Sequence, residues 1–313
     1  PHGGLADFAA RRIRPVGDAV SRVREHAIRW LPYYRKAHEL GFELDGAVRD
    51  LREQLDPALL TSLPKEAVAL ELRAIVTRCA SPGRCLLDLH EDGLLATLSP
   101  VLDRQFDGRP AGPQRWHPEV SQGLHLVLAL EWAVAHTRHL DERARAAVMF
   151  AVLCHDLGKS LTEPDRFPRH HGHEGAGVAL VDELAARWPG LMDQRTARLA
   201  KDVSALHLEV RRLGELRAGT LARLSERHFR ADAYPLAEFA LAVAADFAGR
   251  LGCERDGLAL AHAITRDLGA LRSACRSVDA GSLRERHEGD LDAFRAALHE
   301  ARARAVAAAR VGR

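Results

Sequence analysis

The sequence predicts an all-α protein, and three observations support this fold class. Ala, Leu and Arg recur along the 313 residues while aromatic residues make up only 5%, a composition that favours helices over sheets. Apolar residues recur at helical spacing in most segments, and no strand-like alternation of apolar and polar residues persists. The chain carries neither an internal repeat nor a low-complexity tract. Its length allows one substantial core or two to three smaller ones.

Residues 1–106 are expected to form a series of helices with short breaks. A turn at Gly3–Gly4 precedes the first helical stretch, and Gly41 follows the end of a longer helix. Pro64 fits the first position of a later helix, because the N–H that it lacks would have no partner there. The predicted helices of this region span residues 5–14, 19–40, 44–55, 64–79 and 86–98.

A polar segment rich in Gly and Pro, DGRPAGPQR at 107–115, is predicted to link two domains. It separates a neck or body region at 1–106 from a second helical domain at 116–254. A strongly charged helical tail is expected at 255–313. Within the second domain, helices are expected near residues 119–138, 141–157, 174–187, 193–213 and 235–250.

Composition excludes several classes of protein. The net charge is only +2, so no overall basic field indicates nucleic-acid binding, although nearly all the positive charge is Arg, which suits phosphate contacts. Five cysteines without a C-x-x-C pair indicate reduced thiols in a cytoplasmic protein. No run of about 18 apolar residues is present, so no membrane span is expected. A start at Pro1, without Met or a secretory signal, suggests that upstream sequence precedes this chain.

The strongest chemical signal is LCHDLGK, which places His155 and Asp156 at the end of the apolar helix RARAAVMFAVLC. That helix is apolar all round and should be buried, so both side chains lie at the mouth of a buried element. An imidazole nitrogen and a carboxylate oxygen are both ligands for a divalent cation. Gly158 is expected to end the helix at a position that tolerates positive φ.

Further candidate ligands lie on apolar helix faces elsewhere in the second domain. Asp246 shares a face with Phe239 and Val243, where a carboxylate is costly unless it is paired or binds a metal. The alternative for Asp246 is a buried salt bridge to an Arg. His125 shares a face with Leu128 and Trp132, and alone would more often be a satisfied core histidine.

Two more histidines complete the series. His207 borders an apolar stripe and is expected to face inward. The segment PRHHGHEGAG contributes His170, His171 and His173, of which His173 lies nearest the next helix. The candidates therefore occur along the chain in the order His125, His155, Asp156, His173, His207 and Asp246.

This order resembles the motif pattern of the HD phosphohydrolase superfamily. The resemblance implies that His125, His155, Asp156 and Asp246 bind one divalent metal and that His173 and His207 support a second. Mixed imidazole and carboxylate ligands suit Ni, Mn, Co, Fe or Zn, and Mg is possible in a weaker site. Asp156, His155 and Lys159 are the expected catalytic residues.

Lys159 and His171 are expected to contact the substrate, with Lys159 binding its phosphate. The alternative for Lys159 is a solvated side chain at a helix C-terminus.

The segments RWHPEVSQGLH (115–125), LCHDLGK (153–159) and TEPDRFPRHHGHEGAGVALV (162–181) narrow the resemblance to bacterial multifunctional CCA-adding enzymes, which are tRNA nucleotidyltransferases. PHGGLADFAARRIR (1–14) resembles the end of their head domain, and weaker similarity covers most of the chain. The resemblance implies an HD domain that hydrolyses 2′,3′-cyclic phosphates, 2′-phosphates and phosphomonoesters, and a helical body that holds tRNA. Nucleotidyl transfer is not expected, because the head with its paired carboxylates is absent from this chain.

Two departures from that family are expected to matter. The nucleotide-recognition motif of the neck reads DAVSR (18–22) here, so that Arg22 alone remains as a candidate RNA contact. Arg211 stands where a second histidine is expected after His207, which weakens the second metal site.

Three functions remain open. The preferred one is a metal-dependent phosphohydrolase acting on nucleotides or RNA ends. The main alternative is the tRNA-binding body of a nucleotidyltransferase, in which the Arg-rich segments 223–230 and 301–310 touch RNA and the HD site is secondary or vestigial. A different HD activity, on nucleoside triphosphates or cyclic dinucleotides, is disfavoured by the flanking motifs. The sequence leaves the oligomeric state open.

Overall fold

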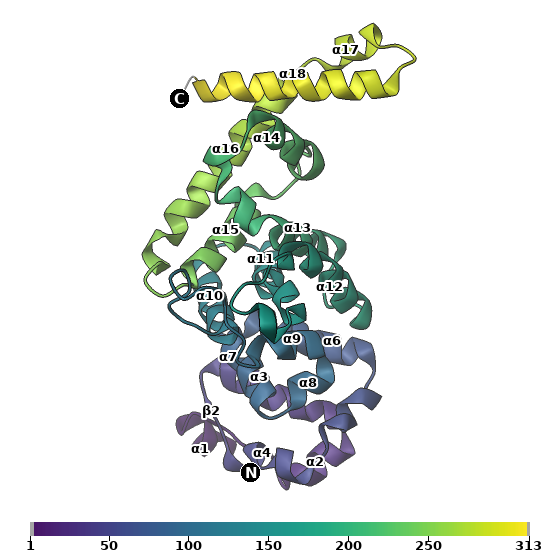
Figure 1. The fold of residues 1–313 in the computed structure, drawn as a ribbon. Coiled ribbons are helices and arrows are strands. Elements are labelled where there is room, and N and C mark those ends of the chain that lie inside the picture. The colour runs from purple at the N-terminus through teal and green to yellow at the C-terminus, as the bar shows by residue number, and fades with distance from the viewer. Residues whose placement is uncertain (1–2, 312–313) are drawn as a thin grey trace.

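The computed structural model describes residues 3–311 and is built almost wholly of helices, so the predicted all-α class is confirmed. The molecule is elongated, with α1, α2 and α4 towards one end, α10–α13 in the middle, and α17 and α18 at the other end (Figure 1). Within the described part of the chain, every helix is too short or too polar to traverse a lipid bilayer. All five cysteines are unpaired, as predicted, and four of them are buried.

The N-terminal region consists of short helices and one small parallel strand pair. Several predicted helices are interrupted: the helix expected over 19–40 breaks at His26, which has an extended backbone, and the one over 86–98 breaks at Gly93, which has positive φ. Pro64 lies at the N-cap, one residue before the predicted position. The elements are α1 (Gly4–Ala9), β1 (Arg12–Ile13), α2 (Ala19–Glu25), η1 (Ala27–Arg29), α3 (Trp30–Leu40), β2 (Glu43–Leu44), α4 (Gly46–Arg49), α5 (Leu51–Gln54), η2 (Pro57–Ser62), α6 (Lys65–Arg78), α7 (Pro82–Glu91), α8 (Leu94–Leu98), α9 (Pro100–Asp103) and η3 (Arg104–Phe106).

The central region surrounds one buried helix. Its elements are α10 (Gln122–His136), α11 (Glu142–Cys154), η4 (Leu157–Leu161), η5 (Pro164–Arg166), α12 (His173–Arg187), α13 (Gln194–Val210), η6 (Leu213–Glu215), α14 (Ala218–Leu224), a π-helical turn η7 (Ser225–Phe229) and α15 (Leu236–Ala248). Residues 146–154 of α11 are all buried, because α10, α13 and α15 pack around the helix. Asp141 and Asp193 cap α11 and α13 by accepting hydrogen bonds from backbone N–H groups of the first turn.

The two predicted domains pack directly on each other. Helix α7 contacts α10, α6 contacts α11, and the buried apolar side chains of both regions form one continuous cluster. The segment 107–115 is not simply an exposed connection, because Arg109 and Ala111 within it are buried against the central region. The division into domains at this segment remains a prediction.

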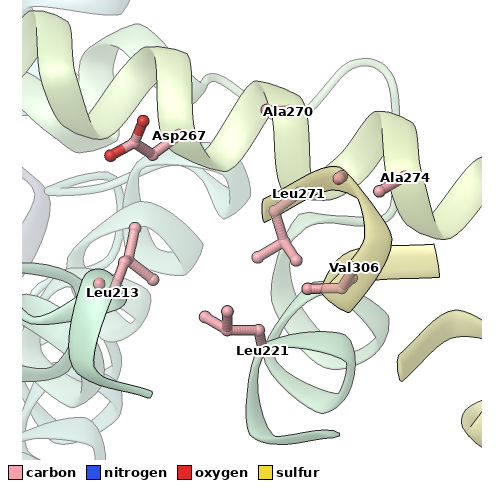
Figure 2. Close-up of a pocket in the computed structure, with 9 residues that line it drawn as sticks. Leu213, Leu221, Asp267, Ala270, Leu271, Ala274 and Val306 are labelled. Atoms are coloured by element: carbon pink, nitrogen blue, oxygen red, sulfur yellow. The ribbon is translucent and has the colours of Figure 1, made fainter. Parts of the chain in front are cut away.

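The C-terminal region extends away from the centre. It comprises η8 (Glu254–Asp256), α16 (Gly257–Arg276), α17 (Ala280–Arg286) and α18 (Leu291–Val311), with α18 packed on α14 and α16. Figure 2 shows Leu221, Leu271 and Val306 directed into a pocket of about 160 Å³ between these three helices. Among the described residues, Asp267 is the one titratable side chain that lines it. The pocket is therefore apolar and has too few polar groups for acid–base or metal chemistry.

Candidate metal centre

The structure brings together the six side chains predicted as metal ligands, although they come from five separate elements. His125 lies on α10, His155 and Asp156 follow the last turn of α11, and each of the other three lies on its own helix. All are buried, with no more than 8% of any residue exposed. The remaining members are His173 on α12, His207 on α13 and Asp246 on α15.

Three of these residues form a compact first group. Nε2 of His125 lies 3.3 Å from Nε2 of His155 and 3.3 Å from Oδ1 of Asp246. His155 Nε2 is 3.0 Å from Oδ2 of Asp156, which joins Asp156 to the group. The ligand atoms of His125, His155 and Asp246 all lie within 4.8 Å of one another, close enough to share one cation.

Asp156 also belongs to a second group. Its Oδ1 lies 3.2 Å from Nε2 of His173 and 3.7 Å from Nε2 of His207, and these three residues again have ligand atoms within 4.8 Å of one another. Oδ2 of Asp156 thus faces His125 and His155, whereas its Oδ1 faces His173 and His207. This arrangement places Asp156 where one carboxylate can bridge two cations.

Backbone oxygens fix the orientation of three of the four histidines. His155 Nδ1 is 2.7 Å from Val152 O, His173 Nδ1 is 2.6 Å from His170 O, and His207 Nδ1 is 3.1 Å from Val203 O. A carbonyl oxygen only accepts, so each Nδ1 carries the proton and each Nε2 presents a lone pair in the neutral ring. The lone pairs of all three rings therefore face the carboxylates inside the site.

A carboxylate that the sequence analysis did not single out orients the fourth histidine. Glu119 Oε1 lies 3.0 Å from Nδ1 of His125 and 2.8 Å from Nδ1 of His117, and the Glu119 side chain is wholly buried. A carboxylate behind a histidine ligand fixes the tautomer and the ring direction. The sequence HPEVSQGLH at 117–125 places this Glu six residues before the candidate histidine.

Asp246 makes the buried salt bridge to an Arg that was its alternative role, with Arg211 Nη1 3.2 Å from its Oδ2. It also faces His125, and metal binding by this carboxylate remains a prediction. Arg250 Nη2 lies 3.9 Å from the other oxygen. Positive charge therefore already compensates one side of this carboxylate.

Lys159 is not the solvated lysine of the alternative interpretation, because only 5% of it is exposed. Its Nζ lies 2.6 Å from Asp156 Oδ2 and donates to Ala111 O at 2.6 Å and to Gln122 Oε1 at 3.3 Å. The ammonium group of Lys159 thus links the Asp156 carboxylate to the backbone at Ala111, in the segment that follows η3. Contact between Lys159 and a substrate phosphate remains a prediction.

Gly158 has a role other than the predicted one. Its φ is not positive; a Cβ there would lie 2.0 Å from His173 O and 2.7 Å from Gly177 N. Only a glycine lets η4 approach the start of α12 this closely. The close contact places the His155–Asp156 turn beside His173.

The charges of the site are strongly perturbed. Burial raises the pKa of Asp156, but His155 and Lys159 lower it more, and the resulting pKa lies well below the ordinary value. Burial lowers the pKa of His207 to about 4, so this ring is neutral near pH 7. An ionised carboxylate and a neutral imidazole are the forms that bind a metal.

A small pocket of about 140 Å³ opens onto the site and is lined by Asp156, Lys159, His173, His207 and Asp246 among others. His170 also lines the pocket, with its Nε2 2.8 Å from Pro110 O. The predicted substrate contact His171 is exposed and lies outside the lining.

The other predicted RNA contacts, Arg22 and the Arg-rich segments, lie outside the lining of the pocket. Arg22 belongs to α2 at the N-terminal end of the molecule, where it contacts Val16 O and Glu25 (Figure 1). The two Arg-rich segments, 223–230 and 301–310, pack against each other. Arg302 pairs with Glu226, and so does His299, which lies just before the second segment.

Comparison with known proteins identifies the family. No protein-family model matches the chain. A multifunctional CCA protein of Cupriavidus metallidurans is 35% identical over 311 residues, which cover 98% of this chain and 70% of that protein. Multifunctional CCA proteins of Burkholderia pseudomallei (strain K96243) and Burkholderia mallei (strain ATCC 23344) are also 35% identical, over 315 residues that cover 99% of this chain and 71% of each relative. The chain therefore belongs to the multifunctional CCA protein family.

Proposed function

We propose that this chain is a metal-dependent phosphohydrolase that acts on 2′,3′-cyclic phosphates, 2′-phosphates and phosphomonoesters of nucleotides or RNA ends. One observation carries the proposal: buried Nε2 lone pairs converge on two buried carboxylates, backbone oxygens fix the direction of three rings, and the Glu119 carboxylate lies 3.0 Å behind the fourth. Four imidazoles and two carboxylates form a donor set that suits Ni, Mn or Co, and Mg less well.

The fit of a cation rests on atoms that protein groups leave unsatisfied. Asp156 Oδ1 and His173 Nε2 lie 3.2 Å apart, yet neither has a hydrogen-bond partner among the described residues. Both atoms are acceptors when the carboxylate is ionised and the ring is neutral, so they cannot satisfy each other. A divalent cation would satisfy both, and burial makes the cost of leaving them without one large.

We assign His125, His155, Asp156 and Asp246 to one ion, and His173 and His207, with Asp156, to a second. A divalent ion held by these residues would supply Lewis-acid chemistry, polarising a phosphoryl oxygen and lowering the pKa of water near neutral pH. Asp156 bridges the two histidine groups, and Lys159 holds its Oδ2 in place.

Lys159 and Arg250, which both line the pocket, attract the substrate phosphate. The walls of the pocket exclude bulk water and so strengthen these charge interactions.

The proposal is tested by hydrolysis of 2′,3′-cyclic AMP. Metal-stripped protein is resupplied with Ni, Mn, Co or Mg in turn, and release of the monophosphate is followed by chromatography. Turnover that appears with metal and disappears with chelator supports the assignment. A folded protein that shows no turnover with any of the four ions contradicts it.

A second candidate function is the binding of tRNA by the helical body, and the family to which the chain belongs favours it. Arg223, Arg227 and Arg230 are exposed on neighbouring turns of α14 and η7, where they can reach RNA phosphates. tRNA binding that weakens with salt but survives Asp156→Ala would support a body that acts separately from the metal centre. In this view the division at 107–115 separates a tRNA-holding body from the hydrolytic domain.

A further inference from the structure

A groove adjoins the pocket of the metal centre and has a different character. Its volume is about 530 Å³, against about 140 Å³ for the pocket, and the two share Pro113, His117, Leu208 and Arg250 in their walls. A ligand that reaches the metal centre through the groove therefore extends well beyond one phosphate group.

An aromatic side chain lies at one side of the groove. Trp116 lines it and is 57% exposed, which is unusual for a residue that normally lies inside the fold. The guanidinium of Arg115 lies 5.1 Å from the centre of the Trp116 ring and supports it. An exposed ring beside a catalytic pocket is the kind of surface on which a nucleic-acid base stacks.

Three arginines line the same groove, and no acidic residue does so among the described residues. Arg211 lies over the Phe247 ring and donates to Asp246, which leaves further N–H groups for a ligand. Arg212 is 69% exposed in its side chain and pairs with Glu215 in a surface contact that contributes little.

Arg250 stands where groove and pocket meet. Its side chain is only 12% exposed, and its Nε has no hydrogen-bond partner in the part of the chain that the structure describes. A buried guanidinium N–H without a partner is costly, and a phosphate oxygen arriving from the groove would satisfy it.

We propose that this groove binds the end of a single-stranded RNA, with a base stacked on Trp116 and the adjoining phosphates held by Arg212 and Arg250. The inference rests on the proposed function, because the terminal phosphate would then enter the metal pocket. An exposed aromatic ring and basic side chains, in a groove whose described lining holds no acidic residue, match RNA, whereas an acidic peptide would leave the Trp116 ring without a stacking partner.

The test measures binding and hydrolysis separately. A fluorescein-labelled six-nucleotide RNA ending in a 3′-hydroxyl has no terminal phosphate to hydrolyse, so its anisotropy reports binding alone. Trp116→Ala is expected to weaken binding about tenfold and Trp116→Phe to restore most of it. Arg212→Ala should reduce the slope of log affinity against log salt by about 1. The matched control is Arg143→Ala, an exposed Arg paired with Asp193 outside the groove, which should bind as the parent does.

The outcomes separate this inference from the proposed function. Weaker binding in the Trp116 and Arg212 variants supports the groove even if no metal restores turnover on 2′,3′-cyclic AMP. Binding that is equal in the parent and both variants overturns the groove, even where hydrolysis is metal-dependent. Failure of the parent to bind the RNA, or equal displacement of the RNA by an acidic peptide, also overturns it.

Discussion

The carboxylate of Glu119 lies 3.0 Å from Nδ1 of His125, and both side chains are completely buried. Glu119 stands in the segment before α10, and its other oxygen is 3.4 Å from the backbone N of Leu251, after α15. The buried Glu119 carboxylate thus contacts both the candidate ligand His125 and the segment at Leu251, which lies far along the chain. Burial raises the pKa of Glu119, but hydrogen bonds from His117 and His125 lower it more, so the group stays ionised.

This relationship predicts that Glu119→Gln weakens metal binding without removing a ligand. Gln keeps the shape but not the charge that orients the His125 ring, and loss of such a partner typically lowers affinity about 10–100-fold. Calorimetric titration with Ni or Mn measures the change. The control is Glu131→Gln on α10, the helix that carries His125, where Glu131 pairs with Arg84 at the surface. Equal affinity in the parent and the Glu119 variant would show that the ring needs no such support.

Arg211→Gln is expected to raise the affinity for metal. The guanidinium 3.2 Å from Asp246 Oδ2 competes with a cation for that carboxylate, and it adds a like charge near the site. Removing it should tighten binding about tenfold, which corresponds to about 1.4 kcal/mol. Arg212→Gln, which alters a neighbouring Arg paired with Glu215, should leave the affinity unchanged. Weaker binding in the Arg211 variant would mean that Arg211 holds Asp246 in position and does not compete for it.

The number of bound ions is expected to depend on His207. If Asp156 bridges two ions, His207→Gln removes a ligand of the second ion only, while His155→Gln removes a ligand of the first. Metal analysis of dialysed protein should fall from two ions to one in the His207 variant, with the tighter of the two binding steps preserved. If both the parent and the variant hold one ion, the site binds a single metal ion and Asp156 does not bridge two.

Gly158→Ala is expected to destabilise the fold, because the new Cβ would meet backbone atoms of His173 and Gly177 that cannot rotate away. Overpacking of this kind costs about 1–3 kcal/mol. Gly175→Ala is the matched control: it lies inside α12 with nothing within 4 Å, and should stabilise by about 0.5–1 kcal/mol. Urea unfolding gives both free energies. Equal stability of the two variants would show that η4 can move away from α12.

The sequence predicted the helices of the central region well, because their apolar faces are long and regular. The expected helices near 141–157 and 174–187 correspond to α11 and α12 within a few residues. The N-terminal region was harder, because its elements are short. His26 and Gly93 end helices through their own backbone conformation, which periodicity does not reveal. The two-residue strands β1 and β2 are too short to show alternation.

His125, His207 and Asp246 could be chosen from the sequence as polar residues on apolar helix faces, where burial without a partner is costly. His155 and Asp156 could be chosen because they end an apolar helix, and His173 because it lies next to a helix start. The residues that support these ligands could not be chosen from the sequence. Nothing local to Lys159 indicates that it pairs with Ala111 and Gln122, which lie more than 30 residues away along the chain. The role of Gly158 likewise depends on contact with α12, and local reasoning assigned it a backbone conformation that it does not adopt.

The most direct test of the metal centre is the turnover of 2′,3′-cyclic AMP by Asp156→Asn, in the presence of the ion that best activates the parent. Asn keeps the shape of Asp156 but cannot bridge the two histidine groups as a carboxylate does. The control is Asp182→Asn, an exposed residue paired with Lys201. The account predicts at least a hundredfold loss of kcat in the Asp156 variant, on the order of a lost catalytic group, with full activity in the control. Equal turnover by the parent and the Asp156 variant would contradict it.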